Sequence, residues 1–198
     1  EWLHVDVTHV QTTIDGVQYV AFIKDNFSGA LLGYRSTPYK PDSSFIRDLF
    51  VQVFIEYNLL DSSDTINILS DGGSENKGSL IEWLNQLVAP PIIRKLTAKT
   101  NEFPFSNSMS ESTHSIYKTE FMQGKFSFDV RQHEKDLDQF MFYYNHKRYL
   151  FRNYGLTTME VLYGQIPNKQ RFRNQIQEGR IDRIEKNRAI NQCPMICQ

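Results

Sequence analysis

The chain opens with the stretch Trp2-Leu3-His4-Val5-Asp6-Val7-Thr8, which gives the first indication of its fold. Apolar and polar residues alternate here, which is the period-two pattern of a β-strand. Asp6 therefore falls in the middle of a predicted strand, where aspartate is disfavoured and an inward-facing carboxylate needs a partner. This anomaly favours a functional role for Asp6 over a structural one.

Two more strands are predicted shortly after the first, over residues 17–24 (VQYVAFIK) and 30–35 (ALLGYR), with a turn between them. Three strands in short succession indicate an antiparallel meander. Asp42 is a good helix N-cap, and the apolar residues after it recur at helical spacing up to Tyr57. A fourth strand over residues 65–70 should end at the turn formed by Asp71, Gly72 and Gly73.

The remaining pattern alternates helices and strands. We expect a helix near residues 80–88, a strand over 92–98, a loop over 99–107, a helix from Ser108 to about Gln123, and a last long helix capped by Asp129. Trp2, Trp83 and the aromatic residues of 140–144 are expected in the core. This order predicts an α/β fold, with a mixed sheet covered by helices on its faces.

Composition narrows the possible classes of protein. The 198 residues are 40% hydrophobic and 13% aromatic, which is enough for one sizeable core. No run of about 18 apolar residues and no signal-peptide pattern is visible, so we expect no membrane contact and a cytoplasmic, nucleoid-associated location. Cys193 and Cys197 have no second pair of ligands nearby with which to complete a zinc site.

The charge is unevenly distributed along the chain. The formal net charge is −1, which does not by itself indicate nucleic acid as a partner. Residues 165–198, however, contain seven basic and three acidic residues, which gives this segment a charge of +4 and leaves −5 for the remainder. We expect residues 165–198 to form a basic, helical extension that contacts DNA or another subunit.

Three carboxylates fall at places where a scaffold could bring them together: Asp6, Asp71 and Glu111. Asp71 begins a turn, where aspartate is also common for structural reasons. Glu111 stands three residues after Ser108, so that it could instead belong to an ordinary capping box. Spacing alone leaves both of these alternatives open.

Several further stretches accompany these acids in a fixed order. They are Phe22-Ile23-Lys24-Asp25-Asn26-Phe27-Ser28 with Gly33, Leu69-Ser70-Asp71-Gly72-Gly73-Ser74-Glu75, Pro104-Phe105-Ser106-Asn107-Ser108-Met109-Ser110-Glu111-Ser112, Lys118-Thr119-Glu120, Tyr144-Asn145-His146-Lys147-Arg148 and Gly155-Leu156-Thr157-Thr158-Met159-Glu160-Val161-Leu162. Together with the opening stretch, this set resembles the DDE superfamily of transposases and retroviral integrases, and more closely the bacterial insertion-sequence transposases of the IS3 type. The resemblance spans residues 2–165. Gly72, Asn76 and Ser106 depart from the usual pattern, but none of them replaces an acid.

The resemblance implies an RNase H-like fold over residues 1–164, with a five-stranded mixed sheet. It implies an enzyme that cleaves and joins DNA strands, with Asp6 bridging two Mg²⁺ or Mn²⁺ ions and with Asp71 and Glu111 each holding one. The nucleophile would be water for cleavage and a DNA 3′-hydroxyl for joining. Carboxylates suit this chemistry because Mg²⁺ prefers hard oxygen ligands, and a pair of ions can clamp both reacting oxygens at phosphorus.

The expected partners follow from the same resemblance: DNA as element ends and target, a second copy of the chain in a dimer or higher oligomer, and a separate or missing N-terminal DNA-recognition domain. Lys118 and His114 share a helix face with Glu111, so they could reach DNA phosphates. Contacts to DNA are also expected from three arginines, Arg148, Arg180 and Arg183. Two alternatives remain, namely an RNase H-like nuclease without joining activity and an inactive domain that binds DNA only.

Overall fold

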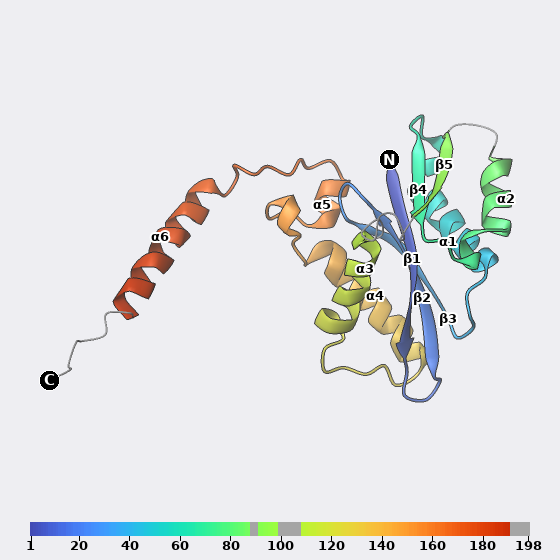
Figure 1. Ribbon diagram of the computed structural model, residues 1–198, viewed down its shortest axis with the longest axis horizontal. Coiled ribbons are helices and arrows are strands. Elements are labelled where there is room, and N and C mark those ends of the chain that lie inside the picture. Colours follow the sequence, from blue (N-terminus) through green and yellow to red (C-terminus); the bar gives the residue numbers. More distant parts are fainter. Residues whose placement is uncertain (88–90, 99–107, 191–198) are drawn as a thin grey trace.

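The computed structural model describes residues 1–87, 91–98 and 108–190, and its centre is a five-stranded sheet with helices on both faces (Figure 1). The strand order is β3-β2-β1-β4-β5. The strands β1 (Trp2–Gln11), β2 (Val17–Asp25) and β3 (Leu31–Thr37) form an antiparallel meander, and β4 (Ile66–Ser70) and β5 (Ile93–Thr97) run parallel to β1. The predicted mixed sheet is therefore confirmed. The loop predicted over 99–107 and Cys193 and Cys197 lie outside the described residues.

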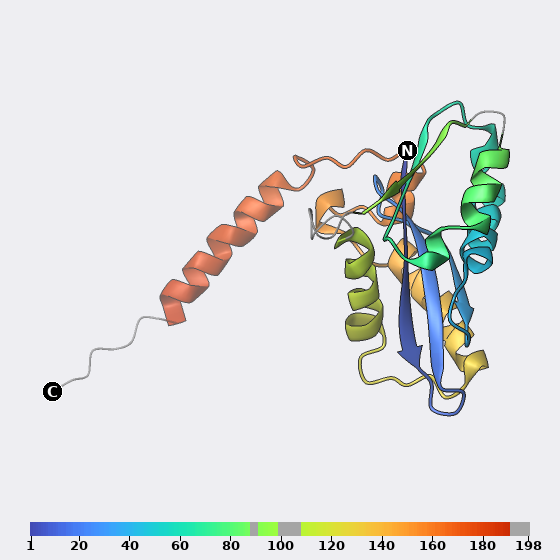
Figure 2. The same cartoon turned by 45° about the vertical axis from the view of Figure 1, so that its right-hand side comes forward.

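One face of the sheet is covered by α1 (Ser43–Glu56) and α2 (Ser79–Gln86), with the short turns η1 (Leu59–Asp61) and η2 (Ser74–Asn76) beside them (Figure 2). The predicted cap is confirmed, since Asp42 Oδ1 accepts a hydrogen bond from the backbone N–H of Phe45 at 2.9 Å. Alternate residues of β1 and β2, Leu3, Val5, Ala21 and Ile23 among them, pack against the apolar face of α1 in the larger core cluster.

The other face is covered by α3 (Ser108–Ser115), η3 (Ile116–Phe121) and α4 (Val130–His146). A helix does extend from Ser108, but from Ile116 it continues as a π-helical turn, a widening that is often found beside functional sites. Asp129 caps α4 as predicted, because its Oδ1 accepts from the N–H of Gln132 at 2.8 Å. The second core cluster joins Val20 and Phe22 to aromatic residues of η3 and α4.

The expectation that all the aromatic residues are buried is wrong in two places. Phe140 and Tyr144 are fully buried, whereas the side chain of Phe142 is 56% exposed and that of Trp2 is 42% exposed. The reason for Phe142 is helical geometry, because a residue two positions from Phe140 points to the opposite side of the helix. On that side Phe142 packs beside His146 and Lys147.

The chain returns to the sheet through η4 (Phe151–Asn153) and α5 (Thr158–Leu162). Asn145 ties α4 to the start of β3, since its side chain accepts from the N–H of Leu31 at 3.0 Å and donates to the Leu31 carbonyl at 2.8 Å. Thr157 and Glu160 form a capping box at the start of α5. These residues of the closing motif are therefore structural.

The last helix, α6 (Arg173–Ile190), stands away from the rest of the molecule at the end of an extended segment (Figures 1 and 2). Its side chains from Arg173 to Ala189 are all exposed. Within the described residues, no helix is both long enough and apolar enough to cross a membrane.

Candidate active site

The parallel pairing of β1 and β4 sets two of the predicted acids at the same level of the sheet. His4 is paired with Leu69. Continuing this register by two residues brings Asp6 opposite Asp71, and neighbouring strands of a sheet lie about 4.8 Å apart. The strand β4 ends at Ser70 while β1 continues to Gln11, so at the level of Asp6 the strand β1 is paired with β2 on one side and no longer with β4 on the other. The two carboxylates therefore belong to the same end of the β1–β4 pair.

Asp71 is held by the turn that follows β4. Its Oδ1 accepts hydrogen bonds from the side-chain amide of Asn76 at 2.6 Å and from the backbone N–H of Gly73 at 3.1 Å. On the neighbouring strand, the ammonium of Lys95 donates to the Ser70 hydroxyl at 3.2 Å. Burial lowers the pKa of Lys95, and the negative charge of Asp71 opposes this decrease. The orientation of Asp71 is thus fixed by groups of its own turn.

Glu111 belongs to α3, which packs against β1. It is exposed, and the electrostatic effect of its charge reaches Asp6. One turn later on the same helix, His114 Nδ1 lies 3.6 Å from Asp6 Oδ2. Burial, together with the charges of Lys118 and Lys24, lowers the pKa of His114 to about 4. His114 is therefore neutral near pH 7 and contacts Asp6 without neutralising it.

Asp6 itself is electrostatically unsatisfied. Burial raises its pKa from 3.8 to about 7, and the carboxylates of Asp71, Glu111 and Glu75 add to this increase. The hydrogen bond that Asp6 Oδ1 accepts from the N–H of Val7 at 2.9 Å acts in the opposite direction. Four acids on β1, the β4 turn and α3 thus share one electrostatic environment, and this environment disfavours the charge of Asp6.

These donors fit a hard divalent cation. Carboxylate oxygens are the ligands that Mg²⁺ prefers, and a cation would relieve the unfavourable charge on Asp6. Nevertheless, in the segments 1–87, 91–98 and 108–190 no three His, Cys, Asp or Glu side chains lie close enough together to form a metal-binding group. Asp71 Oδ1 is taken up by Gly73 and Asn76, and Asp6 faces His114. The acids are neighbours without being arranged as a closed set of ligands.

The predicted DNA-contacting residues lie in three places. Lys118 is exposed on η3, close enough for its charge to act on His114. Arg148 is engaged by Glu120, with Nε 3.0 Å from Glu120 Oε1. Arg180 and Arg183 lie on the detached helix α6. The structure therefore brings Lys118 and His114 to the acids, but not Arg180 or Arg183.

Four residues near the acids were not assigned a role from the sequence. Glu75 adds a fourth carboxylate, and Asn76 and Lys95 surround Asp71. Lys24 is only 3% exposed, and its ammonium donates to the Thr113 hydroxyl at 2.8 Å. Lys24 had a visible signal, since it lies in a strand that is otherwise almost entirely apolar. Asn76 was visible in the sequence only as a departure from the motif, and the places of Glu75 and Lys95 beside the acids required the fold of the η2 turn and of β5.

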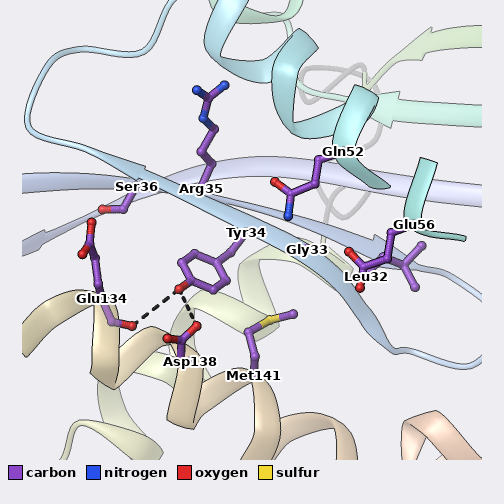
Figure 3. A pocket seen from close by; sticks show the side chains of 10 residues that line it. All are labelled: Leu32, Gly33, Tyr34, Arg35, Ser36, Gln52, Glu56, Glu134, Asp138 and Met141. Carbon is purple, nitrogen blue, oxygen red and sulfur yellow. Dashed lines mark hydrogen bonds between the residues drawn. The ribbon is translucent and has the colours of Figure 1, made fainter. Parts of the chain in front are cut away.

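A large cavity among the described residues lies away from these acids. It has a volume of about 530 Å³ and runs along the edge strand β3 between α1 and α4 (Figure 3). Tyr34 crosses it and donates to Asp138 Oδ1 at 2.8 Å. Glu56 and Glu134 make this groove acidic, and β2 separates it from β1. It contains none of the predicted ligands and is not the candidate active site.

Comparison with known proteins supports the fold. No protein-family model matches the chain, and no curated protein sequence matches it. Among solved structures, it is similar to a chain of the simian T-cell lymphotropic virus intasome in complex with PP2A regulatory subunit B56 gamma, with a TM-score of 0.64 and 18% identity. That match covers 85% of this chain and 57% of the other.

A second similar structure is the HTLV-2 integrase catalytic core domain in complex with magnesium, in a dimeric form. The TM-score is 0.56 at 17% identity, and the match covers 81% of this chain and 94% of the other. Identities this low establish the fold alone. The RNase H-like fold of integrase catalytic cores is thereby confirmed for this chain.

Proposed function

We propose that this chain is the catalytic domain of a DDE-type DNA transposase or integrase and that it cuts and joins DNA strands. Within this class, we propose that it is most similar to the IS3-type insertion-sequence transposases. The observation that carries the proposal is the β1–β4 register, which pairs His4 with Leu69 and, continued by two residues, brings Asp6 opposite Asp71, together with the electrostatic effect of Glu111 on Asp6. The order of motifs in the sequence and the integrase-core fold support it. Asp6, Asp71 and Glu111 are the proposed catalytic residues.

Each of the three acids has a distinct task in this proposal. Asp6 would supply the central oxygen ligand, because burial and the neighbouring carboxylates disfavour its charge unless a cation is bound. Asp71, oriented by Asn76, would contribute from one side, and Glu111 on α3 from the other. Bound Mg²⁺ or Mn²⁺ would supply charge stabilisation to the oxygens that attack and leave phosphorus.

The proposed substrate is DNA. Lys118, one turn beyond His114 on the same side of the helix, would bind a phosphate next to the scissile bond. Arg180 and Arg183 would add phosphate contacts through the free-standing helix α6. Arg148 would bind a phosphate while it also forms an ion pair with Glu120. Dimerisation is proposed as well, and the dimeric form of the similar HTLV-2 core is in line with it.

The test is a strand-joining assay with a labelled DNA that ends in a 3′-hydroxyl, a target plasmid and Mg²⁺ or Mn²⁺. Asp6→Asn, Asp71→Asn and Glu111→Gln should each abolish joining. Glu111→Gln also separates the two interpretations of Glu111, because glutamine can replace glutamate in a capping box but is a poor metal ligand. Glu82→Gln, which alters an exposed acid on α2, is the matched control and should remain active.

Each pattern of results identifies one function. Metal-dependent cleavage without joining would assign the chain to RNase H-like nucleases. DNA binding without cleavage in either metal would make it a binding domain. Joining by the Asp6→Asn variant at the wild-type rate would exclude the proposed site.

A further inference from the structure

A second pocket, smaller than the groove at β3, lies beside the helix that carries Glu111. It has a volume of about 290 Å³ and is bounded by Ser112 and Ile116 on the α3 side, by Tyr144 of α4, and by the chain segment 150–152. Ser112 directly follows Glu111, so that one wall of the pocket adjoins a proposed catalytic residue. We call this cavity the α3 pocket.

The walls of the α3 pocket are mostly apolar and include two aromatic rings. Tyr144 is buried at its base, while Phe151 at its rim is 96% exposed. The nearby Tyr149 is exposed as well. An aromatic side chain that is almost fully exposed to water beside an apolar cavity indicates a site where a ligand could bind and cover the ring.

The segment 139–159, which forms one side of the α3 pocket, is basic, whereas Glu111 adjoins another wall and Glu120 pairs with Arg148. Residues 139–159 contain Lys147, Arg148 and Arg152 and no acidic residue. Arg152 lines the pocket and reaches the Asn26 carbonyl at 2.8 Å, and Lys24 lies at its base with its ammonium 5.3 Å from the centre of the Tyr144 ring. A ligand that fits this pocket therefore has a flat apolar part to contact the aromatic rings and a negatively charged group to contact Arg152.

We propose that the α3 pocket binds an unstacked nucleobase of the DNA end, with the base against Phe151 and its phosphate towards Arg152. This inference rests on the proposed function. Stacking of bases on aromatic side chains with a cationic backbone groove is the general way in which proteins hold single-stranded nucleic acid. The position next to Glu111 would keep a frayed strand end close to the reacting phosphate.

The test measures binding in EDTA, so that catalysis plays no part. A duplex with a single-stranded 3′ extension contains 2-aminopurine in the extension, and a blunt duplex of the same sequence serves as reference. Wild-type protein should quench the fluorescence and bind the extended DNA more tightly. Phe151→Ala should weaken that binding roughly 5- to 150-fold, the range expected for one stacked base, while binding of the blunt duplex stays nearly unchanged.

Three further proteins complete the experiment. Phe151→Trp restores a ring and should keep the quenching, whereas Phe151→Leu, which is apolar without a ring, should lose it. Phe126→Ala is the matched control, since Phe126 is 85% exposed and lies next to Ser127, which contacts the β1–β2 hairpin at the opposite end of β2 from Lys24. All variants should unfold at the wild-type temperature, because the replaced rings lie almost entirely in water.

The failures of the two proposals can be told apart. Equal quenching and affinity for Phe151→Ala and wild type, with duplex binding intact, would overturn the nucleobase site alone. Failure to bind any DNA would overturn the proposed function and this site with it. Self-association that depends on Phe151 in the absence of DNA would show that the α3 pocket binds a second copy of the chain, and it would overturn the proposal that the pocket binds a nucleobase.

Discussion

At the scale of single residues, the raised pKa of Asp6 is the property most closely related to the proposed function. A folded-state pKa of about 7 against 3.8 means that the unfolded chain loses this proton first. Stability contributed by protonated Asp6 is thus fully present below about pH 4 and is lost as the pH rises through about 7. Such a group reduces stability at neutral pH unless a cation is bound.

Asp6→Asn should therefore be more stable than the wild type at pH 7.5 in EDTA, by an amount on the order of 3–4 kcal/mol at most, and the difference should disappear near pH 4. The same variant should lose all activity. Urea unfolding at the two pH values measures the first effect. A variant less stable than wild type at pH 7.5 would show that Asp6 is already satisfied within the fold.

Lys24 gives a second pH dependence with the opposite sign. Burial, with smaller contributions from Arg152 and Arg148, lowers its pKa from 10.5 to about 7. The unfolded chain then holds more protons than the folded one between about pH 7 and pH 10.5, so stability should increase as the pH rises through this range. Lys24→Met should flatten this increase, as followed by urea unfolding. An unchanged slope would mean that Lys24 remains charged beside Thr113 and Tyr144.

At the scale of elements, the packing of α1 on the sheet depends on one glycine. A Cβ at position 33 of β3 would lie 2.7 Å from Val53 Cγ2 and 3.4 Å from Leu49 Cδ1 of α1. Gly33→Ala should thus destabilise the protein by about 1–3 kcal/mol, as overpacking of a core does. The measurement is denaturant unfolding.

A double variant tests the cause of that destabilisation. In Gly33→Ala with Val53→Ala, the total decrease in stability should be smaller than the sum of the two single decreases, because the added methyl fills the space that Val53 vacates. Gly179→Ala in the exposed helix α6 has nothing within 4 Å of the new methyl and should cost no stability. Additive decreases would show that α1 can shift away from β3.

The elements themselves could largely be predicted from the sequence. The alternation around Asp6 and the helical spacing after Asp42 are strong local signals, and the strands and helices they predict are present. The change to π-helical geometry at Ile116 has no such signal, whereas the exposure of Phe142 follows from its two-residue spacing from Phe140 and could have been predicted. The pairing of Asp71 with Asn76 depends on the fold of a turn, which residue spacing does not determine.

At the scale of the whole molecule, the separation of the basic helix from the acidic core defines an arm. Removal of residues 165–198 should weaken DNA binding and flatten its dependence on salt. For each DNA phosphate that the arm no longer neutralises, the slope of log affinity against log salt should decrease by about 0.9. Metal binding at the acids should survive, because the side chains of α6 are exposed and pack against none of them in the described structure.

Two substitutions in α6 test the same prediction without the indirect effects that a truncation can have on the rest of the protein. Arg180→Gln with Arg183→Gln should reduce the salt slope by up to about 1.8, while Lys40→Gln on the exposed loop before α1 should leave it unaltered. Fluorescence anisotropy over a series of salt concentrations gives both slopes. The same slope in the double variant and the wild type would show that α6 does not touch DNA.

If Asp6, Asp71 and Glu111 form one metal site, a crystal soaked in Mn²⁺ should show an ion bound between them. Manganese accepts the same oxygen ligands as magnesium and can be located by its anomalous scattering. We expect a manganese peak bound by carboxylate oxygens of Asp6 and Asp71, with Glu111 turned towards the ion or ions. A fully soaked crystal with no manganese at Asp6 and Asp71, or with manganese bound only elsewhere, would contradict it.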